Sequence, residues 1–207
     1  MTSLDDVSPD RLSLYVNASL VPLFFQLLGH GFYVSVQTGC SVKELLCDQL
    51  GINEDYLDQR IKTIFLNGKV VDNVQSAIVQ ADDTMALSGA MPGLVGAILR
   101  SGGFYAPMRS QISHDKNIPA SQLKKGRITL KLWNLIVKEL GPNFLQQGIW
   151  IKAEEAGSFM ERHREELLKV CTSAEMDRKS IALDQLQDIT WKSDPVFLQV
   201  NCDKNGS

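Results

Sequence analysis

The residues best suited to binding chemistry gather in one glycine-rich segment near the middle of the chain. They are Gly93, Gly96, Arg100, Gly102, Gly103, Tyr105 and Arg109. Glycine-rich backbone can present successive N–H groups to an anion, and the planar guanidinium of arginine matches phosphate or carboxylate. We favour a structural connector here, and the alternative is a small-molecule or anion site in which Arg100, Tyr105 and Arg109 form a polar cluster. The glycine spacing matches no nucleotide-binding fingerprint, because no clear capped helix follows at the required distance.

The histidine and cysteine residues form no recognisable catalytic or metal-binding pattern. His30, His114 and His163 lie far apart, and we interpret each as a residue that satisfies a local hydrogen bond. The cysteines lack a paired C-x-x-C spacing, which argues against a structural zinc site. Cys40 directly precedes a predicted helix, whose dipole would lower the thiol pKa, but no base accompanies it. We favour a structural role for Cys40, and the sequence predicts no catalysis, no metal and no cofactor.

Composition and charge argue against several classes of partner. The chain has 207 residues and a net charge of −3, so it is longer than a typical domain and has no overall basic character. Lys124, Lys125 and Arg127 form one local basic cluster, which we interpret as solvated linker charge, and we expect no nucleic-acid partner. The first residues are acidic and polar, and no apolar run approaches the roughly 18 residues of a membrane span. We therefore expect a cytoplasmic protein with reduced thiols and no membrane contact.

The elements that must position these residues repeat along the chain. Residues 12–16 (Leu-Ser-Leu-Tyr-Val) and residues 128–132 (Ile-Thr-Leu-Lys-Leu) share one apolar alternation. The later parts of the two copies also match: a short strand with a central aromatic at residues 32–34 and 149–151, and a turn with an alternating strand at residues 83–88 and 194–199. The repeat predicts two compact units of about 90 residues each.

Turn and cap signals separate the predicted elements of the first copy. A strand and an apolar stretch with helical spacing come first. Ser41 and Glu44 then make a capping box for a second helix. Asn67-Gly68 joins a strand at residues 61–66 to its return strand, because both turn residues tolerate positive φ. One more strand closes the copy.

This order of strand, helix and hairpin resembles the β-grasp fold, specifically the sulfur-carrier group that contains the molybdopterin-synthase small subunit and the thiamine sulfur-carrier protein. The likeness covers about residues 11–96 and rests on three motifs: residues 41–46 (Ser-Val-Lys-Glu-Leu-Leu), residues 66–71 (Leu-Asn-Gly-Lys-Val-Val) and residues 82–87 (Asp-Asp-Thr-Met-Ala-Leu). It implies an α+β chain of tandem β-grasp (ubiquitin-like) units. We expect domains at residues 11–88 and 127–202, joined by a glycine-rich connector at residues 89–126.

The second copy keeps the pattern less strictly. Residues 158–161 (Ser-Phe-Met-Glu) stand where the first copy begins its capped helix, and residues 176–181 stand where it forms its hairpin. The central pair Asp177-Arg178 contains no glycine, so we expect a looser turn there. Trp150 should point away from the face of its strand that its two neighbours share. We favour packing of Trp150 against the first copy, with an exposed apolar patch for a partner as the alternative.

Two functions follow from the resemblance. Sulfur carriers, as the resemblance implies, activate the carboxylate of a terminal Gly-Gly and convert it to a thiocarboxylate. The candidate pair here is Gly102-Gly103, and a carrier would need cleavage after Gly103, since an internal peptide bond offers no carboxylate. We favour a non-catalytic binding or adaptor protein that docks a protein partner through exposed sheet surface, as ubiquitin-like folds often do.

Overall fold

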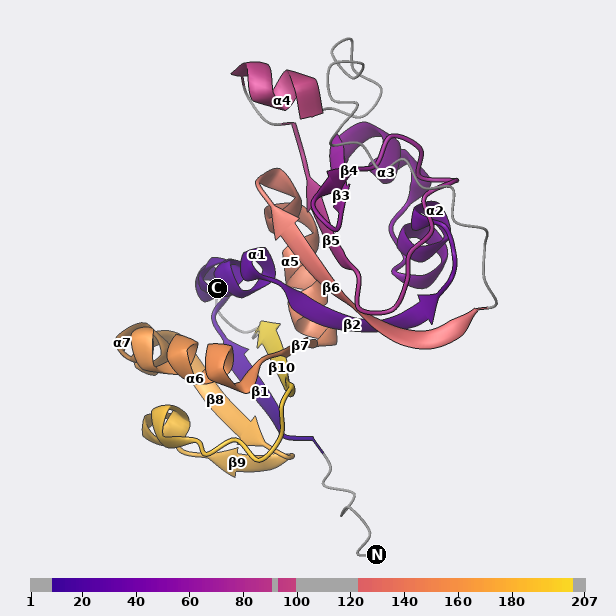
Figure 1. The fold of residues 1–207 in the computed structure, drawn as a ribbon. Helices are drawn as coiled ribbons and strands as arrows, with labels where there is room; N and C mark the ends of the chain where they lie inside the picture. The colour runs from indigo at the N-terminus through magenta and orange to yellow at the C-terminus, as the bar shows by residue number, and fades with distance from the viewer. Residues whose placement is uncertain (1–8, 91–92, 100–122, 203–207) are drawn as a thin grey trace, which may run out of the picture. The chain divides into compact units, whose positions relative to one another are not determined.

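Two compact units make up the chain. The computed structural model describes residues 9–90, 93–99 and 123–202, and Figure 1 shows their helices and strands. The central unit is Leu28–Leu140, and the terminal unit combines the residues up to Leu27 with those from Gly141 onward. Two helices, α1 (Phe25–His30) and α5 (Leu135–Gln147), each contribute residues to both units.

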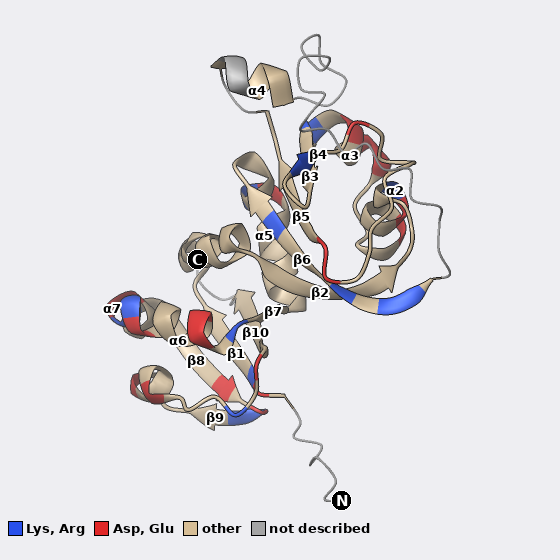
Figure 2. Ribbon diagram, in the orientation of Figure 1, with Lys and Arg blue, Asp and Glu red and all other residues tan. Residues whose placement is uncertain are grey.

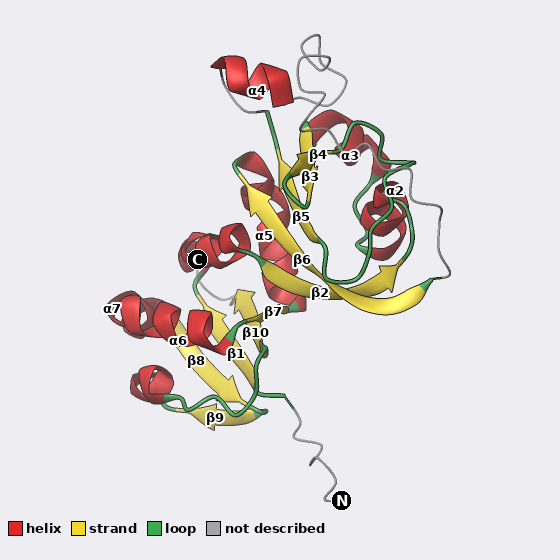
Figure 3. Ribbon diagram, in the orientation of Figure 1, coloured by secondary structure: helices red, strands yellow, loops and turns green. Residues whose placement is uncertain are grey.

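The central unit is a mixed sheet with helices. Its strands are β2 (Phe32–Thr38), β3 (Thr63–Leu66), β4 (Lys69–Val70), β5 (Thr84–Ser88) and β6 (Lys124–Trp133). Its other helical segments are α2 (Val42–Glu44), the π-helical η2 (Leu45–Gln49), α3 (Glu54–Arg60) and α4 (Gly93–Leu99). The strands align in the order β4-β3-β5-β6-β2, in which β5 and β6 are parallel and the other neighbours are antiparallel (Figure 3).

Alternation along β2 and β6 separates a core face from an outer face in the central unit, whereas β5 is buried on both faces. Phe32 pairs with Leu130, and both side chains are fully buried. The segment α2–η2 lies against this core face and buries Leu45 and Leu46 there. Removing each such side chain from water contributes roughly 1.5–3 kcal/mol, which is what holds the short helical segment on the sheet. The intervening strand residues point to the outer face.

The terminal unit has the same kind of architecture. Its strands are β1 (Arg11–Val16), β7 (Ile149–Ile151), β8 (Cys171–Met176), β9 (Lys179–Ile181) and β10 (Val196–Cys202). Its other helical segments are η1 (Ala18–Phe24), α6 (Ala153–Arg162), α7 (Arg164–Val170) and the 3-10 helix η4 (Leu183–Asp188). The strand order is β7-β10-β1-β8-β9, with β1 and β10 parallel. Mixed helix and strand content in both units agrees with the expected α+β class.

The first strand of each sequence copy lies in the sheet of the other copy. β1 opens the first copy, but it pairs with β10 and β8 of the terminal unit. β6 opens the second copy, but it pairs with β2 and β5 of the central unit. The bounds of the two compact units therefore differ from the domains expected at residues 11–88 and 127–202, because each unit contains a strand from the opposite copy.

Of the two predicted hairpin turns, the first is confirmed and the second differs from the expectation. Asn67 and Gly68 have φ of 52° and 77° and join β3 to β4 in the expected two-residue turn. The looser turn expected at Asp177-Arg178 is wrong, because these residues have φ of 51° and 66° and connect β8 to β9 just as tightly. The backbone N–H of Arg11 donates to Asp177 Oδ1 at 3.0 Å and the N–H of Asp177 donates to Arg11 O at 2.8 Å. Strand β1 thus holds the turn without a glycine.

Two further expectations concern the second copy. The predicted helix start at residues 158–161 is wrong, since α6 begins at Ala153 and Ser158 lies within it. Trp150 does point away from the buried Ile149 and Ile151, and its ring stands 5.1 Å from the ring of Phe197 in an edge-on arrangement. Across residues 9–90, 93–99 and 123–202, no helix has the length and apolarity that crossing a bilayer requires.

Candidate functional site

The outer face of the central unit carries a line of cations. Lys125, Arg127 and Lys131 alternate along β6 with the buried residues of the core, so all three project from the outer face. We call these three residues the basic row. At about 3.4 Å per residue, Lys125 and Arg127 are spaced by roughly 7 Å along the strand. Figure 2 shows basic residues at the start of β6, where the strand runs beside β2.

Arg127 is oriented by an aromatic ring on the neighbouring strand. Its Cζ lies 4.4 Å from the ring centroid of Tyr33, a distance at which the cation is attracted to the π face. Ser35 is the register partner of Arg127, and Gln37 is the partner of Lys125. Registered partners on antiparallel strands share a face, so a hydroxyl and an amide lie beside the two cations.

A hollow of about 710 Å³ runs along this part of the strand pair. Its lining residues are Ser35, Val36, Gln37, Gln49, Lys125, Gly126 and Arg127. Gln49 closes one side, because its Oε1 accepts from the backbone N–H of Gln37 at 2.7 Å and its Nε2 donates to the carbonyl of Gln37 at 2.9 Å. The hollow therefore combines two cations with neutral hydrogen-bonding groups, a lining suited to an anionic group.

Close packing at Gly126 shapes the same region. A Cβ at this position would lie 2.8 Å from Cγ2 of Thr38 and 3.3 Å from Cβ of Ala81. Thr38 itself is buried and donates its hydroxyl to the carbonyl of Lys124 at 3.2 Å. Glycine therefore lets β6 approach its neighbours closely between Lys125 and Arg127.

Charge is unevenly distributed over the central unit, although Asp82 and Asp83 in the loop before β5 lie beside β6. The strands β2 to β6 contain lysine and arginine but no aspartate or glutamate. The helical segments on the core side are rich in acids, which are Glu44, Asp48, Glu54, Asp55 and Asp58. No described acidic side chain forms an ion pair with the basic row.

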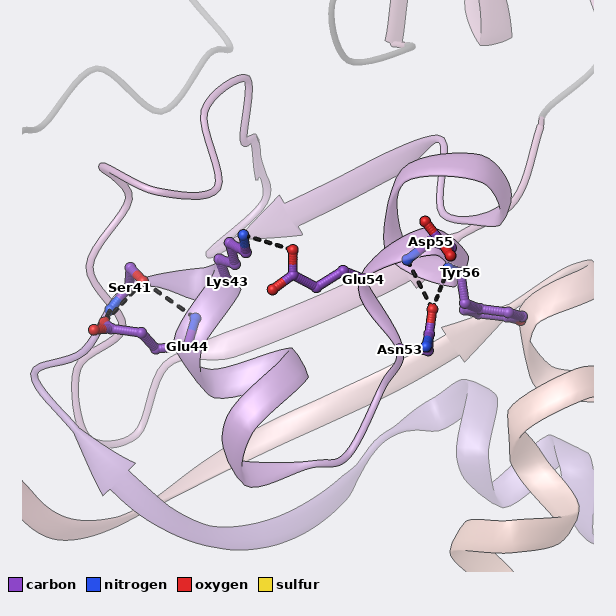
Figure 4. A network of polar contacts seen from close by, with 7 residues as sticks. All are labelled: Ser41, Lys43, Glu44, Asn53, Glu54, Asp55 and Tyr56. Carbon is purple, nitrogen blue, oxygen red and sulfur yellow. Dashed lines mark hydrogen bonds and ion pairs between the residues drawn. The ribbon is translucent and has the colours of Figure 1, made fainter.

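The acidic side is internally paired and capped (Figure 4). The Nζ of Lys43 lies 2.8 Å from Glu54 Oε2, and this contact raises the pKa of Lys43. Ser41 donates its backbone N–H to the Glu44 carboxylate at 2.7 Å and its hydroxyl accepts from the Glu44 N–H, which confirms the predicted capping box. The hydrogen bonds from the Ser41 backbone and hydroxyl lower the pKa of Glu44. These groups thus stabilise helix ends.

Two of the predicted binding residues, Gly93 and Gly96, lie within the described part of the chain. Gly93 is the first residue of α4, with φ of 81° and open space around it, and Gly96 is buried within α4. The other predicted residues lie outside the described residues, namely Arg100, Gly102, Gly103, Tyr105 and Arg109. The anion-binding cluster and the carrier function at Gly103 therefore stay predictions. The expected connector ends earlier than residue 126, because β6 begins at Lys124.

The pKa of Cys40 is raised, whereas its position before a helix predicted a lowered pKa. The thiol is buried and donates to the carbonyl of Gln37 at 3.2 Å. Burial, followed by the nearby charge of Glu44, raises the pKa of Cys40. A raised pKa keeps the sulfur as a thiol at neutral pH, which agrees with the structural role that we favoured over a reactive one.

A second hollow, of about 430 Å³, lies in the terminal unit and includes Asp10 in its lining. Asp10 is only 2% exposed, and its Oδ2 accepts from the backbone N–H groups of Lys192 and Ser193. The Asp10 carboxylate already accepts hydrogen bonds from the protein backbone. It therefore holds the segment before β10 in place, and we do not assign it to ligand binding. Among the described residues, no cluster of His, Cys, Asp and Glu could hold a metal ion.

Comparison of the chain with protein-family models, with curated proteins and with solved structures gave no match. The function is therefore inferred from the geometry of the basic row and the sheet face around it. Sequence reasoning missed this row because Lys125 and Arg127 were assigned to a linker. The available signal was their period of two with the apolar residues that follow, since Ile128, Leu130 and Leu132 continue the alternation.

Proposed function

We propose that this protein is a non-catalytic binding or adaptor protein that docks a protein partner on the outer face of the central unit. The observation that carries the proposal is the exposed outer face of β2 and of the start of β6. Helical segments bury the core face, while Ser35, Lys125 and Arg127 on the outer face are exposed. An open sheet face with oriented polar and aromatic groups is a surface that a second protein can contact without any change in backbone.

The composition of the outer face supports protein docking. Interfaces between proteins are enriched in tyrosine, tryptophan and arginine. Tyr33 and Trp133 are half-buried on the outer face, and Arg127 stacks on Tyr33. The ring of Trp133 is fixed by a hydrogen bond from its Nε1 to the carbonyl of Gly29 at 3.0 Å, so binding would cost little side-chain entropy there.

The β-grasp resemblance supports the same function at the level of fold. A mixed sheet with a short helical segment on one face, together with the Asn67-Gly68 hairpin, is the arrangement that the resemblance implied for the first copy. We propose that both units are diverged β-grasp units whose first strands are exchanged.

The proposal is tested by blocking the outer face with a bulky side chain. Ser35→Trp places an indole beside Arg127, whereas Ser180→Trp makes the same change at an exposed position on β9 of the terminal unit. Tagged wild-type protein and both variants are used for affinity capture from the cells of origin, with partners identified by mass spectrometry. We expect one partner to be captured by wild type and Ser180→Trp but lost from Ser35→Trp. Equal capture by all three proteins would reject the outer face as the docking site.

A further inference from the structure

We infer that the part of the partner that lies on the basic row is an extended acidic segment, whose carboxylates pair with Lys125, Arg127 and Lys131. This inference rests on the proposed function and names the chemistry of the partner. Its starting point is charge complementarity. The cations of the basic row form no ion pair with a described acidic side chain. Of the two acids in the loop beside β6, Asp83 accepts hydrogen bonds from Asn67 and Gln80, and Asp82 is exposed.

The spacing of the cations fits an extended chain. Lys125 and Arg127 stand two residues apart on one strand, and Lys131 stands four residues further along. Side chains on one face of an extended peptide recur every two residues, at roughly 7 Å. A partner segment with acids at alternate positions therefore matches the row in register, whereas a helical segment brings residues of one face to three- and four-residue spacings.

The partner must lie on the sheet rather than extend it at this site. β6 is hydrogen-bonded to β2 on one side over residues 124–130. On its other side it pairs with β5 from Thr129 onward, and the carbonyl of Arg127 accepts from the backbone N–H of Asp82. Recognition on β6 therefore falls to side chains. The hollow lined by Ser35, Gln37 and the two cations can hold one carboxylate with charge-assisted hydrogen bonds.

The aromatic residues argue against single-stranded nucleic acid as the occupant. Nucleic-acid binding on an open sheet uses free ring faces for base stacking. Here one face of Tyr33 is occupied by the Arg127 guanidinium at 4.4 Å, and Trp133 packs against Phe65 with 5.9 Å between ring centroids. The Tyr33 ring orients Arg127, and an acidic segment needs only the cations.

The test uses a 12-residue peptide of alternating Glu and Thr with a fluorescein label, and it measures binding by fluorescence anisotropy. The matched probes are a Gln-Thr peptide of equal length and a labelled 12-nucleotide oligo(dT). The proteins are wild type, the double variant Lys125→Glu with Arg127→Glu, and a control of equal charge change in the terminal unit, Arg164→Glu with Lys179→Glu. Both control positions are exposed.

We expect the Glu-Thr peptide to bind wild type and the control equally, and to bind Lys125→Glu with Arg127→Glu about tenfold more weakly, as two exposed ion pairs would give. Raising the salt concentration should weaken binding, and the Gln-Thr peptide should not bind. If the Glu double variant fails to fold by circular dichroism, the milder pair Lys125→Gln with Arg127→Gln should show a smaller loss of the same sign.

Three results would overturn the inference: no binding of the Glu-Thr peptide, equal loss in the control, or tighter binding of oligo(dT) that also depends on Lys125 and Arg127. The proposed function is judged separately. A partner that is lost from Ser35→Trp but retained by Lys125→Glu with Arg127→Glu would leave docking on the outer face intact and reject the acidic segment. A partner retained by Ser35→Trp would reject the docking site itself.

Discussion

Arg127 lies over the aromatic ring of Tyr33, with 4.4 Å between its Cζ and the ring centroid. The two residues come from adjacent strands of the central unit, β6 and β2. The contact ties one cation of the basic row to a fixed position on the sheet, so the row is a feature of the folded unit rather than a set of freely moving side chains.

The first prediction concerns the energy of this contact. A double-mutant cycle with Tyr33→Ala and Arg127→Ala should give a coupling free energy of about 0.5–1 kcal/mol, the range for an exposed cation–π pair. Tyr33→Phe keeps a π face and should keep most of the coupling. Urea unfolding of the four proteins measures it, and a coupling near zero would mean that the ring does not hold the guanidinium in solution.

The second prediction concerns the close approach at Gly126. Gly126→Ala should lower the free energy of unfolding by about 1–3 kcal/mol, because its Cβ would meet Thr38 at 2.8 Å. Thr38→Ala in the same chain should recover part of the loss. Gly89→Ala is the matched control, since a Cβ there would find its nearest neighbour at 3.5 Å. Equal effects of Gly126→Ala and Gly89→Ala on urea unfolding would contradict the packing seen at β6.

The third prediction concerns acid stability of the capping box. Hydrogen bonds from Ser41 lower the pKa of Glu44 below its ordinary value of 4.5. A depressed folded-state pKa stabilises the protein above the unfolded pKa, and that stabilisation disappears as the pH falls through the folded pKa. The stability difference between wild type and Glu44→Gln should therefore be present at pH 7 and shrink below about pH 4.5.

Unfolding by urea between pH 7 and pH 3 measures this difference. Ser41→Ala should cost about 1 kcal/mol at pH 7, as loss of a helix N-cap usually does. The control is Asp48→Asn, an exposed acid on η2 that does not take part in the capping box. A pH dependence of Asp48→Asn equal to that of Glu44→Gln would show that general charge, not the capping hydrogen bonds, produces the effect.

The fourth prediction concerns the exchanged first strands. A fragment of residues 28–147 contains all strands of the central unit, including β6. A fragment of residues 9–90 contains β2 to β5 but lacks β6, which stands between β5 and β2. We expect cooperative unfolding by urea for the first fragment and none for the second. Cooperative unfolding of residues 9–90 alone would mean that each sequence copy folds with its own first strand.

Local features of this fold could be predicted from sequence, because the responsible residues are neighbours in the chain. Ser41 and Glu44 cap their own helix, and Asn67-Gly68 turns its own hairpin. Alternation identified the faces of β1 and β6 correctly, but it does not state which strands will be partners. The alternation of apolar residues therefore does not predict that β1 pairs with β10 and β8, or that β6 pairs with β2 and β5.

The candidate site was missed for a related reason. Lys125 and Arg127 flank a glycine next to a polar segment, which is typical of a linker, and only the pairing of β6 with β2 shows that they project from a sheet. Asp177-Arg178 was missed because the turn depends on hydrogen bonds with Arg11, a residue far away in sequence. In both cases the deciding contact is tertiary.

The most direct test of the account is site-specific photo-crosslinking in the cells of origin. A p-benzoylphenylalanine replaces Ser35 on the outer face in one protein and Asp48 on the helical side in another, both at exposed positions. We predict a discrete protein adduct from position 35 and none from position 48. Adducts from position 48 alone, or no protein adduct from position 35, would contradict docking on the outer face of the central unit.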